Sequence, residues 1–193
     1  MTGFASKRQS SNREGVEVGK RSDFERKQLD YYPTPLAAFA PLIPHLPRTG
    51  TFCEPCAGAG VLIDHIENHT KLRCVSAFDV EPRRYDIRVG DASWALPDDM
   101  LEADFCITNP PWDRPVLHQI IERLPSIKPT WLLFDADWAH TRQASRYLEI
   151  CHKIVAIGRV KWIEDSEMAG KDNACWYFFD ASFTGPTTFV GRP

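Results

Sequence analysis

Hydrophobic residues along the chain follow two different periods, which alternate from the N-terminal to the C-terminal end. Continuous apolar runs of strand length predict strands at 51–54, 72–79, 85–91, 103–109, 130–137, 152–158 and 175–180. Apolar residues spaced at three and four positions predict helices at 36–46, 61–69, 115–124 and 141–150. Strands that alternate with helices in this way indicate an α/β fold, with a mostly parallel sheet covered by helices on both faces.

The last two predicted strands, 152–158 and 175–180, differ from the others in their connection. A polar segment without helical spacing joins them, and it includes the residues from Glu164 to Asn173. A parallel pair needs a long crossover, whereas an antiparallel pair does not. The sequence therefore predicts a seven-stranded sheet that is mostly parallel and ends in an antiparallel C-terminal hairpin.

Composition divides the 193 residues into two parts. Residues 1–28 are polar and lack hydrophobic periodicity, so we expect a flexible arm there. Residues 29–193 are expected to form one catalytic domain. No apolar run is long enough to span a bilayer, and the N-terminal end lacks the apolar core of a secretory signal, so we expect a cytoplasmic protein with no membrane partner.

Charge and cysteine content bear on which nucleic-acid and metal-binding roles the chain can have. The net charge of −3 argues against a protein that coats nucleic acid indiscriminately, but leaves a local basic surface open. The six cysteines lie mostly in apolar, strand-like surroundings, so we expect reduced thiols. Cys53 and Cys56 form a CxxC without a second ligand pair, and we expect no metal site.

Candidate binding residues follow the predicted strands at their carboxyl ends, where open α/β sheets bind ligands. The first strand leads into the turn Glu54-Pro55-Cys56-Ala57-Gly58-Ala59-Gly60, whose glycines let a ligand approach the backbone. Asp79 follows the second strand at the spacing typical of a carboxylate that binds a ribose. After the third strand, Asp91 and Ala92 occupy a position from which a carboxylate can accept a hydrogen bond from an adenine amine.

The motif Asn109-Pro110-Pro111-Trp112 after the fourth strand is the most specific signal in the chain. With it the chain resembles the S-adenosylmethionine-dependent amino-methyltransferases of nucleic acids, whose signature is (Asp/Asn/Ser)-Pro-Pro-(aromatic). The resemblance covers about residues 31–180, and its motif order (YYPTP, EPCAGAG, Asp79, Asp91, NPPW) is that of the gamma arrangement. The chain departs from the family at Cys56, where an aromatic residue is frequent, and at Trp112, where tyrosine or phenylalanine is commoner.

The resemblance implies a Rossmann-like class I methyltransferase fold, S-adenosylmethionine as cofactor and a set of site residues. The implied catalytic residues are Asn109, Pro110, Pro111 and Trp112. The implied cofactor-binding residues are Tyr32, Thr34, Pro35, Glu54, Cys56, Gly58, Gly60, Asp79, Val80, Asp91, Ala92 and Asn109. For Tyr31, Tyr32 and Thr34, a hydrophobic staple with Thr34 as a helix cap is an equally good interpretation.

The chemistry accounts for the residue types in this motif. The lone pair of an exocyclic amine is delocalised into its ring, so the amine is a poor nucleophile until two acceptors orient its hydrogens. The side chain of Asn109 and the carbonyl group of Pro110 supply two such acceptors, and Trp112 supplies a flat face that can stack on a flipped-out base. Methyl transfer is then a direct displacement without a covalent enzyme intermediate.

Residues further along the chain are weaker candidates for substrate contact. Trp138 follows the fifth strand and either lines the substrate cleft or is buried, with Asp137 capping the next helix. The loop between the last two strands carries Lys161, Trp162, Lys171 and Asn173, which are suited to phosphate and base contacts. The same loop contains acidic residues, so a solvated hairpin loop is an equally good interpretation.

The leading functional prediction is N6 methylation of adenine in DNA by a small stand-alone enzyme of the kind found in phages. RNA adenine is the first alternative, followed by N4-cytosine and by protein glutamine. A non-catalytic nucleic-acid-binding subunit is a further alternative of another class. A homodimer or a partner subunit is left open, because gamma-type DNA enzymes usually carry a separate recognition domain and we expect none in this chain.

Overall fold

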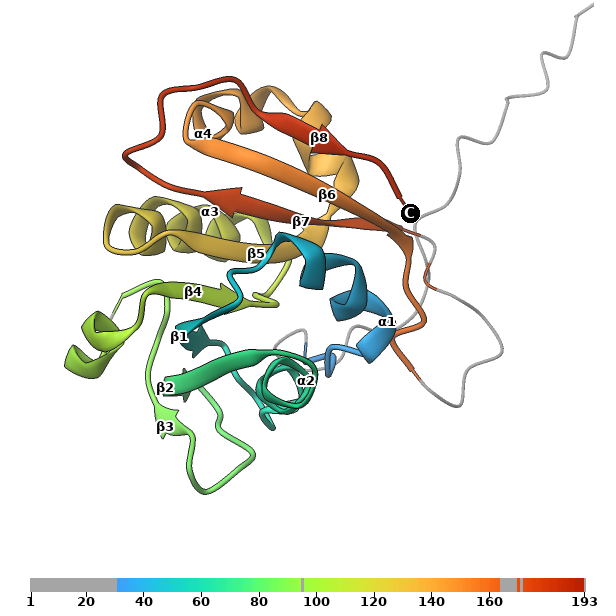
Figure 1. Cartoon of the computed structure of the whole chain (residues 1–193). Coiled ribbons are helices and arrows are strands. Elements are labelled where there is room, and N and C mark those ends of the chain that lie inside the picture. The colour runs from blue at the N-terminus through green and yellow to red at the C-terminus, as the bar shows by residue number, and fades with distance from the viewer. Residues whose placement is uncertain (1–30, 95, 164–169, 171, 193) are drawn as a thin grey trace, which may run out of the picture.

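The computed structural model describes residues 31–94, 96–163, 170 and 172–192. The predicted arm at 1–28 and the candidate residue Lys171 therefore lie outside the described residues. The described chain forms one sheet with helices on both of its faces (Figure 1).

The sheet contains eight strands within the described residues, in the spatial order β3-β2-β1-β4-β5-β7-β6-β8. Their bounds are β1 (Thr49–Pro55), β2 (Lys71–Asp79), β3 (Arg88–Val89), β4 (Phe105–Thr108), β5 (Thr130–Asp135), β6 (Cys151–Arg159), β7 (Asn173–Phe179) and β8 (Thr188–Val190). The five strands from β3 to β5 are parallel, and β7 runs antiparallel to both β5 and β6. The predicted mixed sheet and its antiparallel hairpin are confirmed.

Two details of the sheet differ from the sequence-based prediction. β8 is an additional strand, parallel to β6, so the sheet has eight strands rather than seven. It escapes prediction because it contains only three residues and Phe189 at its centre is 66% exposed, which leaves no buried alternation to recognise. The order of the hairpin strands in the sheet is also reversed relative to the chain, since β7 lies between β5 and β6.

The helices begin and end close to the predicted positions, but two of them are partly 3₁₀. Their bounds are α1 (Leu36–Phe39), α2 (Val61–His69), α3 (Arg114–Arg123) and α4 (Ser145–Leu148). After α1 the chain continues as a 3₁₀ helix over Ala40–His45, which contains Pro41 and Pro44. Proline cannot donate the hydrogen bond that an α-helix requires, so the predicted helix at 36–46 changes type after one turn. None of the described helices is long and apolar enough to cross a membrane.

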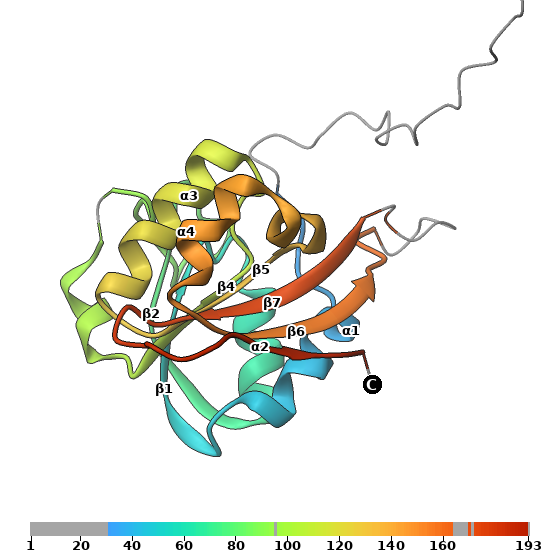
Figure 2. The ribbon, with the colours of Figure 1, turned by 90° about the horizontal axis from the view of Figure 1, so that it is seen from above.

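Each face of the sheet carries its own hydrophobic layer. Leu42, Ile63 and Ile66 belong to the layer beneath α1 and α2, whereas Leu117, Ile121 and Tyr147 belong to the layer beneath α3 and α4. Figure 2 shows α3 and α4 on one side of the sheet and α1 and α2 on the other. The central strands β4 and β5 are buried on both faces, as their continuous apolar sequences predict.

The strand order changes direction between β1 and β4. Such a switch point opens a crevice at the carboxyl ends of the two strands, because their connections leave toward opposite faces of the sheet. The turn after β1 contains the predicted glycines, and NPPW follows β4 directly. The fold therefore brings the two strongest sequence motifs to the same crevice.

Because Leu132 lies in the middle of β5 and is fully buried, the fold should be sensitive to its truncation. We expect Leu132→Ala to lower the free energy of unfolding by about 2–5 kcal/mol, since it removes buried methyl groups and leaves a cavity. Urea denaturation measures this change. The control Leu101→Ala shortens a leucine that is 59% exposed and should alter stability by less than about 0.5 kcal/mol. Equal effects of the two substitutions would contradict the assignment of β5 to the core.

Candidate active site

A cavity of about 480 Å³ lies at the carboxyl ends of β1, β2 and β4. Its volume is within the range of about 300–1,000 Å³ that is usual for small-molecule sites. Eleven of the predicted site residues line it, namely Tyr32, Thr34, Glu54, Cys56, Gly58, Asp79, Val80, Asp91, Ala92, Asn109 and Pro111. Pro35, Gly60, Pro110 and Trp112 are not among its lining residues.

The turn after β1 is built from residues in left-handed backbone conformations. Cys56 has φ of 67°, Gly58 of 53° and Gly60 of 73°. A β-carbon on Gly58 would lie 2.5 Å from Cε2 of Tyr31, so any other residue would displace that ring and would also be strained at the positive φ of Gly58. Glycine is thus needed at this position because the chain's own Tyr31 side chain comes close to the backbone. Cys56 adopts the same conformation with a side chain, which is rare for a residue other than glycine.

The two predicted carboxylates lie on the wall of the cavity with different surroundings. Asp79 accepts hydrogen bonds from the backbone N–H groups of Gly58 and Glu81, each at 2.8 Å, and so joins the glycine turn to the end of β2. Oδ1 of Asp91 accepts from the N–H and the hydroxyl group of Ser93 at 2.8 and 2.6 Å. Both side chains are thus held in fixed orientations at the cavity wall.

The segment 31–34 lies along the cavity, and two side-chain contacts fix it there. The guanidinium group of Arg83 lies 3.9 Å from the centre of the Tyr31 ring, which packs between Arg83 and Gly58. The carbonyl group of Tyr32 accepts a hydrogen bond from Nδ2 of Asn109 at 3.2 Å. Thr34 lines the cavity and is 4% exposed.

The alternative interpretation of this segment is wrong in one respect. The residue that precedes the first turn of α1 is Pro35, and no side chain caps that helix. The predicted Thr34 cap is therefore absent. Pro35 instead accepts hydrogen bonds from the N–H groups of Ala38 and Phe39 through its carbonyl group, so it begins α1.

NPPW turns the chain from β4 into α3. Asn109 is partly buried and lines the cavity. The indole N–H of Trp112 points to Oδ1 of Asn109 at 3.4 Å and to the carbonyl oxygen of Leu133 at 3.2 Å. Trp112 is half-buried and packs against both hydrophobic layers. In this conformation the Trp112 ring packs in the protein interior beside Asn109 and does not line the cavity.

Glu54 is a buried carboxyl group at the floor of the cavity. It is 3% exposed, and its Oε2 has no hydrogen-bond partner among the described residues. Burial raises the pKa of Glu54 well above its ordinary value of 4.5, and a backbone hydrogen bond at Ile63 and the charge of Arg84 oppose this shift only in part. A carboxyl oxygen buried without a partner indicates a place for a ligand group that donates hydrogen bonds or carries positive charge.

The weaker candidates for substrate contact differ in whether their side chains are buried or exposed. Trp138 is fully buried and its indole N–H donates to Nε2 of His118 at 3.1 Å, so the prediction that it lines a cleft is wrong and the buried alternative is correct. The side chain that caps the following 3₁₀ helix is Asp135 rather than Asp137. Trp162 lies beside Trp112, with ring centroids 5.6 Å apart and planes at 87°. Lys161 and Asn173 are exposed at the same end of β6 and β7.

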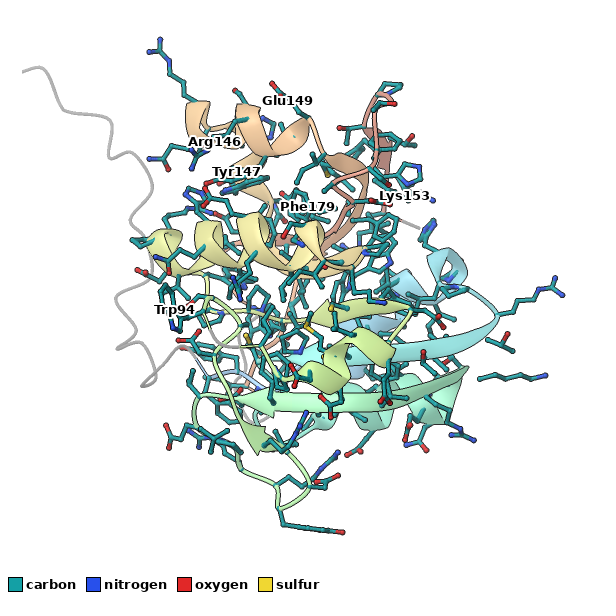
Figure 3. The ribbon with its side chains drawn as sticks, turned by 90° about the vertical axis from the view of Figure 1, so that its left-hand side faces the viewer. Trp94, Arg146, Tyr147, Glu149, Lys153 and Phe179 are labelled. Atoms are coloured by element: carbon teal, nitrogen blue, oxygen red, sulfur yellow. The ribbon has the colours of Figure 1, made fainter. Side chains whose placement is uncertain are left out.

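Sequence reasoning missed several residues that line the cavity. Arg83 is one, because nothing in the sequence places it over Tyr31. Val116 and Ile120 from α3 are others, and their spacing of four positions predicts only a core-facing helix. Trp94 follows the lining residue Ser93 but projects outward and is 79% exposed (Figure 3).

Solved structures of low sequence identity share this fold. A protein of Pyrococcus horikoshii, provisionally described as an RNA methyltransferase, is 14% identical, with a TM-score of 0.53 over 83% of this chain and 92% of that chain. A modification subunit from Vibrio vulnificus, provisionally assigned to a type I restriction enzyme, is 14% identical, with a TM-score of 0.51 over 83% of this chain and 47% of that chain. A chain of the Mtq2–Trm112 complex of E. cuniculi is 13% identical, with a TM-score of 0.52 over 75% of this chain and 93% of that chain.

These likenesses confirm the predicted Rossmann-like fold, which this chain shares with solved class I methyltransferases. No protein-family model and no curated protein matches the sequence. The chain spans less than half of the Vibrio vulnificus subunit but most of the other two proteins.

The raised pKa of Glu54 predicts a stability that depends on pH. Its carboxyl group keeps its proton to a higher pH in the folded chain than in the unfolded chain, so this group makes folding less favourable as pH rises above about 4.5. We expect Glu54→Gln, which cannot ionise, to gain stability relative to the wild type between pH 4 and pH 8, as measured by urea denaturation. Glu102→Gln, at an exposed position, is the control. A constant difference between wild type and Glu54→Gln across this range would contradict the burial of an ionisable group.

Proposed function

We propose that this chain transfers a methyl group from S-adenosylmethionine to the N6 amine of adenine in DNA. The observation that carries the proposal is the position of Asn109. Asn109 lines the same cavity as Asp79 and Asp91. This supports the proposal, because an acceptor for a target amine would then lie beside a pocket suited to a nucleoside.

The lining residues fit a positively charged nucleoside cofactor. Five carboxyl groups line the cavity (Glu54, Asp79, Glu81, Asp91 and Asp113), whereas the one Lys or Arg among the described lining residues is Arg83. S-adenosylmethionine carries a sulfonium and an ammonium group, and an acidic cavity favours such cations. Oε2 of Glu54, buried without a partner among the described residues, would accept a hydrogen bond from the ammonium group, whose positive charge would favour the ionised form of this carboxyl group. Asp79 and Asp91 would hold the ribose and the adenine.

The reaction needs no covalent contribution from the protein. The cofactor supplies an electrophilic methyl group on its sulfonium. Asn109 and the carbonyl group of Pro110 would accept hydrogen bonds from the two hydrogens of the target amine, which would direct the nitrogen lone pair toward that methyl group. As the N–C bond formed, the sulfur would leave with the electrons of its bond to the methyl group, and the methylated amine would lose one proton. Positioning of this kind is a large part of enzymatic rate enhancement. Cys56 takes no part as a nucleophile, because burial raises the pKa of its thiol and keeps it protonated.

RNA adenine is the second candidate substrate. The favouring observation is the fold shared with the Pyrococcus horikoshii protein, which is provisionally described as an RNA methyltransferase. The E. cuniculi complex is described as methylating a translation termination factor, so a protein acceptor is a third outcome that the assay must detect.

The first experiment is methyl transfer from S-adenosylmethionine to duplex DNA, single-stranded DNA and RNA, followed by digestion and mass spectrometry of the nucleosides. We expect N6-methyldeoxyadenosine. N6-methyladenosine from the RNA sample alone would move the function to RNA. Absence of any methylated nucleoside, while the cofactor still raises the melting temperature, would refute nucleic-acid methylation and direct the assay to protein acceptors.

Substitutions separate the two halves of the site. We expect Asn109→Ala to lower kcat at least about 100-fold, because it removes an acceptor that acts on the transferring nitrogen, while cofactor binding remains measurable. Asp79→Ala should weaken cofactor binding at least about tenfold, since it removes a charged acceptor and loosens the glycine turn. Calorimetry and single-turnover kinetics measure these effects. The exposed positions Asn68 and Asp98 provide matched alanine controls. Full transfer by Asn109→Ala would exclude its catalytic role.

A further inference from the structure

The indole N–H of Trp112 is shared between two acceptors. One is the carbonyl oxygen of Leu133 on β5 at 3.2 Å, and the other is Oδ1 of Asn109 at 3.4 Å. The last residue pair between β4 and β5 joins Thr108 to Leu132, so Leu133 lies one residue beyond the end of the β4 pairing. Through this shared hydrogen bond, the sheet backbone fixes the position of the side chain that contacts Asn109.

The carboxamide of Asn109 is held at its other end as well. Its Nδ2 donates to the carbonyl oxygen of Tyr32 at 3.2 Å. A carbonyl group can only accept and an indole N–H can only donate, so the two neighbours together permit one orientation of the amide. An amide oxygen has two lone pairs, and the Trp112 contact leaves one of them for another donor.

The ring of Trp112 is placed for packing rather than for contact with a ligand in the cavity. It packs against both hydrophobic layers, and its neighbour Trp162 lies at nearly a right angle to it. It is not a lining residue of the cavity, although Asn109 and Pro111 of the same motif are. The N–H group of Trp112, rather than its ring face, is thus the part that reaches Asn109.

We propose that Trp112 is a positioning residue for methyl transfer, whose indole N–H holds Oδ1 of Asn109 in the orientation that accepts a hydrogen from the target amine. This inference rests on the proposed function of Asn109. It differs from the prediction that Trp112 stacks on the flipped-out base, and the two roles respond differently to one substitution. Phenylalanine keeps an aromatic face for stacking but has no N–H group.

The test compares Trp112→Phe with the wild type on whichever acceptor the wild type methylates. We expect kcat to fall about tenfold or more, because the reacting nitrogen is less well oriented, while the KM for the acceptor and the Kd for S-adenosylmethionine change by less than about twofold. A stacking role predicts that Phe preserves kcat. Unchanged kcat in Trp112→Phe, or a change confined to the KM for the acceptor, overturns the proposal.

Trp176→Phe is the matched control for the loss of an indole hydrogen bond. The N–H of Trp176 donates to the carbonyl oxygen of Ala38 at 2.8 Å, and the side chain is fully buried in the layer beneath α1 and α2. We expect this variant to have a lower melting temperature but a kcat within about twofold of the wild type, because its N–H is not bonded to Asn109. An equal fall in kcat in both variants would indicate a general effect of destabilisation and would count against Trp112 as a positioning residue.

A second measurement does not depend on activity. In a ¹⁵N-labelled sample, the indole N–H resonance of Trp112 is the one lost in Trp112→Phe. We expect Asn109→Ala to shift this resonance and to leave that of Trp176, lost in Trp176→Phe, in place. An unmoved Trp112 resonance would overturn the proposal even in a chain that shows no methyl transfer. Failure of the wild type to methylate any acceptor, with the resonance shifted as expected, would instead refute only the proposed function.

Discussion

The junction between β1 and β4 is the constraint on which the site depends. The hydroxyl group of Thr108, the last residue of β4, donates a hydrogen bond to the carbonyl group of Pro55, the last residue of β1. Thr108 is fully buried, so this bond is protected from competition with water. The turn that begins at Cys56 and the motif that begins at Asn109 therefore leave the sheet from one shared point. The floor of the cavity and the candidate catalytic amide have a fixed separation for that reason.

Much of the fold could be predicted because the burial of its central strands and helices follows the hydrophobic pattern of the sequence. β5 is a continuous apolar run covered on both faces, and α3 presents its buried residues at helical spacing, so local sequence and tertiary position agree. β8 could not be predicted, because three residues with an exposed Phe189 carry no pattern that distinguishes a strand from a loop. The insertion of β7 between β5 and β6 is likewise a choice of pairing partner, which hydrophobic periodicity does not encode.

The site shows the same division between what is local and what is not. Gly58, Asp79 and Asn109 were identified because each follows a predicted strand within a recognisable motif, and the fold gathers all three at one cavity. The contact of Arg83 with Tyr31 joins residues 52 positions apart, and no local pattern encodes it. Trp138 failed as a candidate because a position after a strand does not determine whether a side chain turns outward or into the core. Its burial depends on α3, where His118 accepts its indole N–H.

The segment 31–34 couples the rim of the cavity to the orientation of Asn109. Its Tyr31 ring covers Gly58 beside the cavity, and the carbonyl group of the next residue holds the carboxamide of Asn109. Any displacement of this segment that carries Tyr32 away from the cavity breaks its hydrogen bond to Asn109. The amide would then keep only its contact with the indole N–H of Trp112. The position of Tyr32 and the orientation of the Asn109 carboxamide are therefore coupled, and a molecule that touches segment 31–34 also acts on the candidate catalytic amide.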